Sequence, residues 1–263
     1  MKISFLIPAF FLFSFIEATA QQSFVRNKNI ISNSVIDLNT GTVVVDSLLL
    51  DVPADGYVLL EFVGYCTASA GDRIVLAASD APQVNYNEDC VMMKVANSDQ
   101  NRISFSHSRL YPVQTGTHDF YAMAERYLET QGNGKIYVYA TLCATYFPNN
   151  VAGQPQVFQH NVDQSDVLAW NNTKVVGQVG FTAPASGKVM VRLDGTCVST
   201  PGDRIFLAAT NGASWDMQSG SVSVEAISNE LLYNPFSHSR IFDVDPGFNL
   251  FYGVVSNMVE TDG

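Results

Sequence analysis

The sequence predicts an all-β protein made of two tandem antiparallel β-sandwich domains with a jelly-roll-like order of strands. Three observations support this prediction. The pentapeptide FSHSR occurs at residues 105–109 and again, letter for letter, at residues 236–240. Short runs of β-branched and aromatic residues alternate with clusters of turn residues, as in sandwiches and jelly rolls. No long stretch repeats its apolar residues with the 3.6-residue period of an amphipathic helix.

The N-terminal segment, residues 1–20, is expected to be a secretory signal peptide. Lys2 precedes the uncharged, mostly apolar run 3–16, and Ala18-Thr19-Ala20 has the small–x–small pattern of a signal-peptidase site. An uncleaved anchor is the alternative, but the run is shorter than the roughly 20 residues that a spanning helix needs. We therefore expect cleavage after Ala20, a secreted or cell-surface protein, and no membrane span.

The first domain, residues 24–148, contains several short segments that read as strands. They are bounded by turn residues such as Asp55-Gly56, Thr115-Gly116 and the Gly132–Gly134 segment, which favour tight reversals of the chain. The last strand, KIYVYATLCATYFP, is the most apolar and is expected to be buried. The expected strands are 43–45, 57–63, 73–77, 91–95, 103–113, 119–124 and 135–148.

An offset of 131 residues relates the first domain to a second copy, residues 156–263, across a linker at 149–155. Gly56 begins GYVLLEFVGYCTASAGDRIVLAAS, and Gly187 begins GKVMVRLDGTCVSTPGDRIFLAAT. From Thr42 and Thr173 onward no gap is needed, and about a third of the positions are identical. The second copy stops where the last strand of the first would begin, so it is expected to be incomplete, either as a fragment or with that strand supplied by another chain.

Composition excludes several classes of function. With 25 acidic and 14 basic residues the net charge is −11, which repels nucleic acid and anionic membranes. The histidines and cysteines do not have zinc-site spacing, and no EF-hand loop is present. We expect no cofactor, no nucleic-acid partner and no enzymatic activity.

The order of these segments resembles the jelly roll shared by tumour necrosis factor and the globular heads of complement component 1, subcomponent q. The resemblance lies in GYVLLEFVGYC, GDRIVLAAS, SHSRLYPVQTGTHDFYAMA and KIYVYATLCATYFP, with a final strand ending in Phe-Pro. One departure is that Gly71-Asp72 precedes an early strand instead of the penultimate one. The resemblance implies a homo-oligomer, specifically a trimer, that binds a ligand or receptor.

In a strand, alternate side chains share a face, so FSHSR presents two different surfaces. His107 and Arg109 lie on an aromatic-rich face suited to burial, as do His238 and Arg240 in the second copy, while the serines face the other way. Asp72 and Asp203, in the twin Gly-Asp-Arg-Ile turns, are candidate ion partners of these arginines, although Arg73 and Arg204 are equally placed to pair with them.

Three interpretations of the FSHSR strand remain open. It is a structural strand that bonds to a neighbour, a surface between domains or subunits, or a hydrolase site using Ser106 or Ser108 with His107. The third is disfavoured because adjacent strand residues point to opposite faces and no nucleophile-elbow motif is present. If the arginines lie beside the histidines, like-charge repulsion is expected to hold both imidazoles neutral.

Four cysteines in an exported chain are candidates for disulfides. Cys66 and Cys197 are equivalent, whereas Cys90 corresponds to Ser221, so symmetry leaves Cys66–Cys143 as the only pairing within a copy that both copies could share. In the resembling jelly roll these two strands are neighbours. Buried free thiols are the equal alternative.

Two functions follow from these expectations. The first is an exported, oligomeric, non-catalytic adhesion, ligand-binding or surface-structural protein. The second is a pair of carbohydrate-binding modules attached to a longer extracellular enzyme, because exposed aromatic residues on a sandwich stack on sugars. The candidate aromatics are Tyr57, Tyr65, Tyr86, Trp170 and Trp215.

Overall fold

A computed structural model describes the protein over most of its length, and almost all of it is antiparallel strand. The all-β prediction is confirmed. The described residues are 23–31, 35–86, 90–95, 101–127, 132–149, 173–199, 202–213, 220–225 and 232–259. The predicted signal peptide and all but the first residue of the predicted linker lie outside these ranges. Within them, no helix has the length and apolar character needed to cross a membrane.

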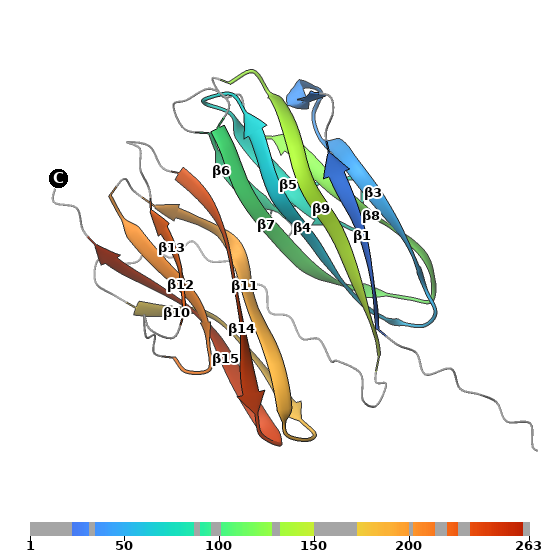
Figure 1. Ribbon diagram of the computed structural model, residues 1–263, viewed down its shortest axis with the longest axis vertical. Helices are drawn as coiled ribbons and strands as arrows, with labels where there is room; N and C mark the ends of the chain where they lie inside the picture. The colour runs from blue at the N-terminus through green and yellow to red at the C-terminus, as the bar shows by residue number, and fades with distance from the viewer. Residues whose placement is uncertain are drawn as a thin grey trace, which may run out of the picture.

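The first half of the chain forms two antiparallel sheets that pack face to face (Figure 1). One sheet has the order β1-β9-β4-β7, with the short β2 also paired to β9, and the other has the order β3-β8-β5-β6. A short 3-10 turn, Leu38–Thr40, follows β2. The strands are β1 (Phe24–Ile31), β2 (Ile36–Asp37), β3 (Val43–Val52), β4 (Gly56–Ala68), β5 (Arg73–Ser79), β6 (Val91–Lys94), β7 (Asn101–Val113), β8 (Gly116–Arg126) and β9 (Lys135–Pro148).

Each described strand of the second half pairs with the same neighbours as its counterpart 131 residues earlier, as far as those neighbours are described. A sheet of order β10-β15-β12-β13 matches β3-β8-β5-β6, and the pair β11-β14 matches β4-β7. The register is the same: Gly56 lies opposite Val113, and Gly187 lies opposite Val244. The strands are β10 (Thr173–Ala183), β11 (Gly187–Ser199), β12 (Arg204–Thr210), β13 (Val222–Glu225), β14 (Leu232–Val244) and β15 (Gly247–Val259).

Even an irregularity is shared between the halves. The pairing of β3 with β8 skips one residue between Val44 and Asp46, and the pairing of β10 with β15 skips one between Val175 and Gly177. A β-bulge bends a strand locally and tends to be retained as a feature of the fold. Sequence positions 131 residues apart therefore occupy the same places in the two sets of strands.

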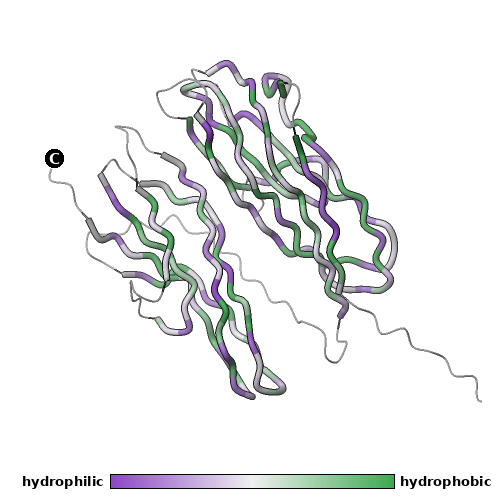
Figure 2. Tube along the Cα trace, in the orientation of Figure 1, coloured by the Kyte–Doolittle hydropathy of each residue, from purple (hydrophilic) through white to green (hydrophobic). Residues whose placement is uncertain are grey.

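The core lies between the two sheets of each half and is built from alternate residues of each strand. Figure 2 shows the resulting alternation of hydrophobic and hydrophilic positions along the strands. In the first half, Val58, Leu60 and Phe62 of β4 are fully buried, and the ring of Phe62 meets that of Phe105 edge-on at 4.8 Å. Burying a side chain of this size contributes about 1.5–3 kcal/mol. The core of the second half is divided into two smaller clusters.

β1 and β3 are the edge strands of the two sheets on the same side of the first sandwich, and side chains of β1 bond to β3 there. Lys28 Nζ donates to Asp46 Oδ1 at 2.5 Å and to the Ser47 carbonyl at 3.1 Å, while Arg26 Nη1 donates to the Leu49 carbonyl at 3.1 Å. Charged residues on edge strands also discourage pairing with other chains.

Candidate functional site

The FSHSR segments lie on β7 and β14, at the edge of one sheet in each half, and their histidines point into the sandwich. His107 Nδ1 accepts a hydrogen bond from the Ala78 amide at 3.0 Å, and His238 Nδ1 accepts one from the Ala209 amide at 3.0 Å. The two histidines thus accept equivalent hydrogen bonds, although His107 is buried and His238 is only partly buried. Each bonds to the opposite sheet rather than to its neighbouring strand.

The backbone explains why a histidine is needed there. β5 pairs with β6 only as far as Leu76, so the Ala78 amide lies beyond the last β5–β6 pair. A buried amide without a partner costs about 1–3 kcal/mol, and His107 supplies the missing acceptor. Tyr111 completes the arrangement by donating its hydroxyl to the Ala78 carbonyl at 2.9 Å. Phe242 holds the equivalent position in the second half and has no hydroxyl.

Burial is the main cause of the lowered pKa of both imidazoles. It lowers the pKa of His107 to about 4, with Asp194 acting in the opposite direction and Arg192 adding a smaller decrease. The pKa of His238 is also lowered, first by burial and then by Arg240. Both imidazoles therefore stay neutral at physiological pH, as expected. The main cause is desolvation, however, and not the repulsion by a neighbouring arginine that was expected from the sequence.

Arg109 and Arg240 lie on the inward-facing side of their strands, close to the sandwich edge and half-buried. The Arg109 guanidinium lies 5.5 Å from the centre of the Tyr111 ring, and that of Arg240 lies 5.1 Å from the Phe242 ring. Such contacts stabilise by about 0.5–1 kcal/mol at exposed sites. The same-face placement of histidine, arginine and aromatic residues therefore agrees with the strand alternation.

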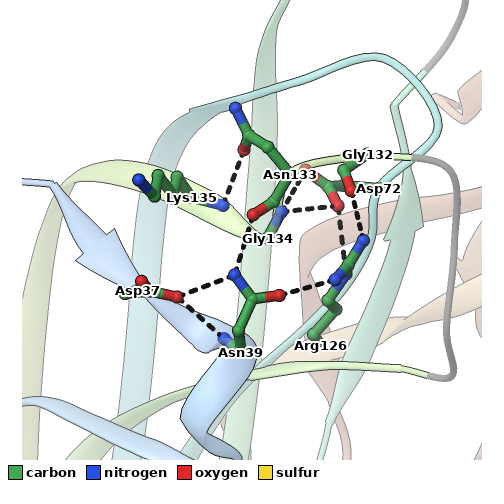
Figure 3. Close-up of polar contacts among 8 residues, drawn as sticks. All are labelled: Asp37, Asn39, Asp72, Arg126, Gly132, Asn133, Gly134 and Lys135. Carbon is green, nitrogen blue, oxygen red and sulfur yellow. Dashed lines mark hydrogen bonds and ion pairs between the residues drawn. The ribbon is translucent and has the colours of Figure 1, made fainter.

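Asp72 is an ion partner, but of an arginine that the sequence analysis did not consider. Its carboxylate is fully buried, and Arg126 Nε lies 3.2 Å from Asp72 Oδ1. It also accepts the Gly134 amide at 3.0 and 3.1 Å (Figure 3). Gly132 is required beside it, because a Cβ there would lie 2.2 Å from Asp72 Cγ.

Asn39 extends this network to the 3-10 turn after β2. It accepts from Arg126 Nη1 at 2.6 Å through Oδ1, and its Nδ2 donates to the Asn133 carbonyl and to Asp37 Oδ1, each at 2.9 Å (Figure 3). Within this network Asp72 and Gly134 are buried, whereas Asp37, Asn39 and Asn133 are exposed. We conclude that the Asp72 network fastens residues 132–134, which lead into β9, to the end of β8 and to the 3-10 turn.

The part of the second half that the structure describes does not repeat the Asp72–Arg126 pair. Asn257 stands where the first half has Arg126, and Asp203 is partly exposed where Asp72 is fully buried. The twin Gly-Asp-Arg-Ile turns therefore do not place their aspartates in equivalent environments. Among the described residues, no group of three or more His, Cys, Asp or Glu side chains is placed to hold a metal ion.

The serines of the first FSHSR point outward and contact the second half. Arg192 Nη2 on β11 donates to Ser106 Oγ at 2.9 Å, and Ser108 Oγ donates to Asp194 Oδ2. Arg192 also pairs with Glu61 on β4, while its Nε lies 2.7 Å from Asp194 Oδ2. This group, formed by Glu61, Ser106, Ser108, Arg192 and Asp194, is referred to below as the contact cluster.

The contact between the halves is asymmetric. β14 lies against β6 and β7, and the Met92 amide of β6 donates to Thr196 Oγ1 at 3.2 Å. A two-fold relation would require β13 to lie against β7 in the same way, yet no comparable contact joins that pair among the described strands. The contacting face of the second half is the outward side of the β11–β14 sheet, and it packs against β6 and β7 at one edge of the first half (Figure 1).

Sequence reasoning missed Glu61, Arg192 and Asp194. A signal was available, because the aligned strands GYVLLEFVGYC and GKVMVRLDGTC carry glutamate and arginine at the same position. Both side chains alternate with buried residues, so both point outward. What could not be read from the strands is that the two outward faces meet.

The predicted Cys66–Cys143 disulfide is wrong. All four cysteines are free thiols. The two strands are neighbours, as expected, but Cys66 lies opposite Val138 and Cys143 lies opposite Glu61. Five residues of strand separate the two positions by roughly 16 Å, beyond the roughly 7 Å that a disulfide spans. The two side chains also point to opposite faces of the sheet.

Comparisons with known proteins give little further information. No protein-family model matches the chain, and no curated protein matches it. A solved structure titled "Structure of the Macrobrachium rosenbergii Nodavirus" aligns over 93% of this chain and 100% of its own, with 10% sequence identity and a TM-score of 0.16. At that TM-score the alignment carries no argument about fold or function.

Proposed function

We propose that this is an exported, non-catalytic adhesion, ligand-binding or surface-structural protein, whose tandem jelly rolls assemble through their sheet faces in the manner of tumour necrosis factor-like domains. The observation that carries the proposal is the asymmetric contact between the halves. A contact between a face of one domain and an edge of the other leaves one matching face and one matching edge unused. Such surfaces bind further copies of the domain, so that the assembly closes into a ring or grows into a filament.

The unused face belongs to the first half. Beyond Glu61, which belongs to the contact cluster, Val63 and Tyr65 occupy the positions that Asp194 and Thr196 occupy in the contacting face of the second half. Val63 is 41% exposed. The matching edge of the second half is formed by β13 and β14, the counterparts of β6 and β7, although β14 itself also lies against β6 and β7. Ser239 on β14 is exposed, whereas its equivalent, Ser108, is engaged in the contact cluster. A third jelly roll related by the same rotation would engage both surfaces.

The unused face has the character of an interface. The rings of Tyr65 and Tyr139 stack at 5.0 Å, and Ile31, which lies opposite Tyr139 on β1, is 64% exposed. Exposed aromatic and aliphatic side chains gathered on one sheet face are typical of protein contacts. We refer to Ile31, Val63, Tyr65 and Tyr139 as the aromatic face.

Light scattering on the purified protein tests the proposal. We expect an oligomer at micromolar concentration, with a trimer as the form that the resemblance implies. Tyr139→Arg is expected to shift the mass to that of a monomer, because an unpaired charge at an interface is costly. Val44→Arg is the matched control, since Val44 is 43% exposed on the other sheet. A wild-type protein that remains monomeric would overturn the proposal.

One observation favours the second candidate, a carbohydrate-binding function. Tyr137 is 39% exposed beside the Tyr65–Tyr139 stack, and the Arg102 guanidinium lies 5.5 Å from the centre of the Tyr65 ring. Flat aromatic surfaces with a neighbouring donor suit sugar rings. A monomer that binds glycans on an array, and loses binding in Tyr137→Ala, would favour this candidate. Trp170 and Trp215 lie outside the described residues.

A further inference from the structure

The chain contains two Asn-Gly dipeptides, Asn133-Gly134 and Asn211-Gly212, in different surroundings. An asparagine followed by glycine loses its side-chain amide without an enzyme where the chain is free to move, because glycine has no side chain to shield its backbone nitrogen. That nitrogen attacks the asparagine Cγ, the bond from Cγ to Nδ2 breaks, and ammonia leaves with the proton of the attacking amide. Water then opens the succinimide ring to aspartate or isoaspartate.

Hydrogen bonds hold the reacting groups of Asn133-Gly134 (Figure 3). The Gly134 amide donates to Asp72 Oδ1 at 3.0 Å and to Asp72 Oδ2 at 3.1 Å. Asn133 Oδ1 accepts the Lys135 amide at 2.9 Å, and the Asn133 carbonyl accepts Asn39 Nδ2 at 2.9 Å. Turning the Gly134 nitrogen toward the Asn133 Cγ would break these contacts, so the folded backbone opposes ring closure.

Burial opposes the reaction at Asn133 as well. The attacking nitrogen must lose its proton, and desolvation disfavours an anion at a buried position such as Gly134. The adjacent Asp72 carboxylate adds like-charge repulsion, of which the Arg126 guanidinium offsets a part. Both the movement and the loss of a proton that ring closure requires are therefore unfavourable here.

Asn211-Gly212 lies in the turn that follows β12, and Asn211 is exposed. Thr210 Oγ1 donates to the Gly212 carbonyl, a group that takes no part in ring closure. At the equivalent position of the first half, 131 residues earlier, the chain has Asp80, which is also exposed. Conversion of Asn211 to aspartate would thus give this turn the residue that its counterpart already has.

We propose that Asn211 is a site of spontaneous deamidation in the folded protein, and that Asp72 protects Asn133 from the same reaction. The modification adds a negative charge to the exposed turn after β12, and the isoaspartate product also lengthens the backbone there. This inference does not depend on the proposed function, because it rests on contacts within each half.

Incubation of the 263-residue protein at mildly alkaline pH, followed by peptide mapping with mass spectrometry, tests the proposal. We expect Asn211 to convert to aspartate and isoaspartate, and Asn133 to react at least roughly tenfold more slowly. In urea, where both dipeptides are unfolded, the two asparagines should react at similar rates. Equal rates in the folded protein would overturn the proposal, as would an Asn211 that reacts only in urea.

Gly212→Ala is the matched variant, and it is expected to fold because Ala81 stands at the equivalent position of the first half. The added methyl group hinders attack by the nitrogen, so the rate at Asn211 should fall roughly tenfold or more while the rate at Asn133 stays unchanged. Hydrogen exchange at the Gly134 amide reports the protection directly, since base-catalysed exchange removes the same proton. It should be much slower than at Gly212, and fast exchange at Gly134 would overturn the role of Asp72.

Discussion

Glu61 and Arg192 form an ion pair between the two halves although they occupy the same position of the repeated domain, 131 residues apart. Equivalent positions meet only near the rotation axis that relates the two domains. Their charges are opposite, so two first halves brought together in this way would face glutamate with glutamate. Charge reversal at this position thus favours the pairing of unlike halves.

Reversing one charge of this pair is expected to loosen the contact between the halves. Glu61→Arg or Arg192→Glu alone should cost roughly 2–5 kcal/mol of docking free energy, because each leaves a partly buried charge beside a like charge. Small-angle scattering should show a larger radius of gyration for each variant. Combining the two substitutions should restore most of the compaction, but not all, because Asp194 would then lie beside a second carboxylate.

The pair Lys188–Asp243 is the matched control for this experiment. Its side chains are 70% and 84% exposed, and exposed ion pairs contribute little. Exchanging its charges should leave the radius of gyration unchanged. If the two single reversals at Glu61 and Arg192 behave like this control, the contact cluster does not hold the halves together.

His107 should make stability depend on pH. Its pKa is about 4 in the folded protein and 6.5 when unperturbed, so the folded state binds fewer protons over this interval. Its contribution is fully present above pH 6.5 and is lost as the pH falls toward 4, in total roughly 3 kcal/mol. Urea unfolding between pH 7.5 and 4.5 measures the slope. An NMR titration that places the His107 pKa near or above 6.5 would contradict this prediction.

His107→Gln separates this effect from the titration of carboxylates. Glutamine keeps an acceptor for the Ala78 amide but does not ionise, so the slope above pH 5 should flatten. The same change at His238 should have a smaller effect, because that imidazole is only partly buried. Equal changes in slope for the two variants would show that burial is not the cause.

Arg126→Ala should strongly destabilise the first half. It leaves the fully buried Asp72 carboxylate without its cation, and breaking a buried ion pair costs about 3–5 kcal/mol. Chemical denaturation monitored at the first half gives the free energy of unfolding. Asp203→Asn in the second half is the comparison and should cost much less, since Asp203 is partly exposed. A loss below about 1 kcal/mol for Arg126→Ala would exclude a stabilising role.

The four thiols should remain reduced and should differ in reactivity. Burial raises the pKa of Cys66 to about 12, and its side chain is inaccessible. The pKa of Cys143 is also raised, but this cysteine is partly exposed on the outer side of β9. Alkylation of the folded protein followed by peptide mapping should therefore label Cys143 well before Cys66. Recovery of a peptide linking Cys66 to another cysteine would disprove the free-thiol assignment.

Much of the fold could be predicted from local patterns. Alternation within FSHSR correctly placed His107 and Phe105 on the buried side of β7, and the apolar run 135–148 correctly predicted β9. The ion partner of Asp72 could not be predicted, because Arg126 comes from β8, a strand that no local pattern connects to the Gly-Asp turn. The prediction of a Cys66–Cys143 disulfide was wrong because knowing that two strands are neighbours does not fix their register. A shift of one residue in register moves a side chain to the other face of the sheet.

The sequence by itself determined the all-β class and the 131-residue repeat, because alternation and internal identity are properties of the chain alone. The tertiary structure decided which outward faces meet. In the sequence, Glu61 and Arg192 have the pattern of ordinary solvated charges on outward faces of strands. They form an ion pair only because one domain packs on the other. The relative placement of two sandwiches cannot be predicted from the residue pattern within a strand.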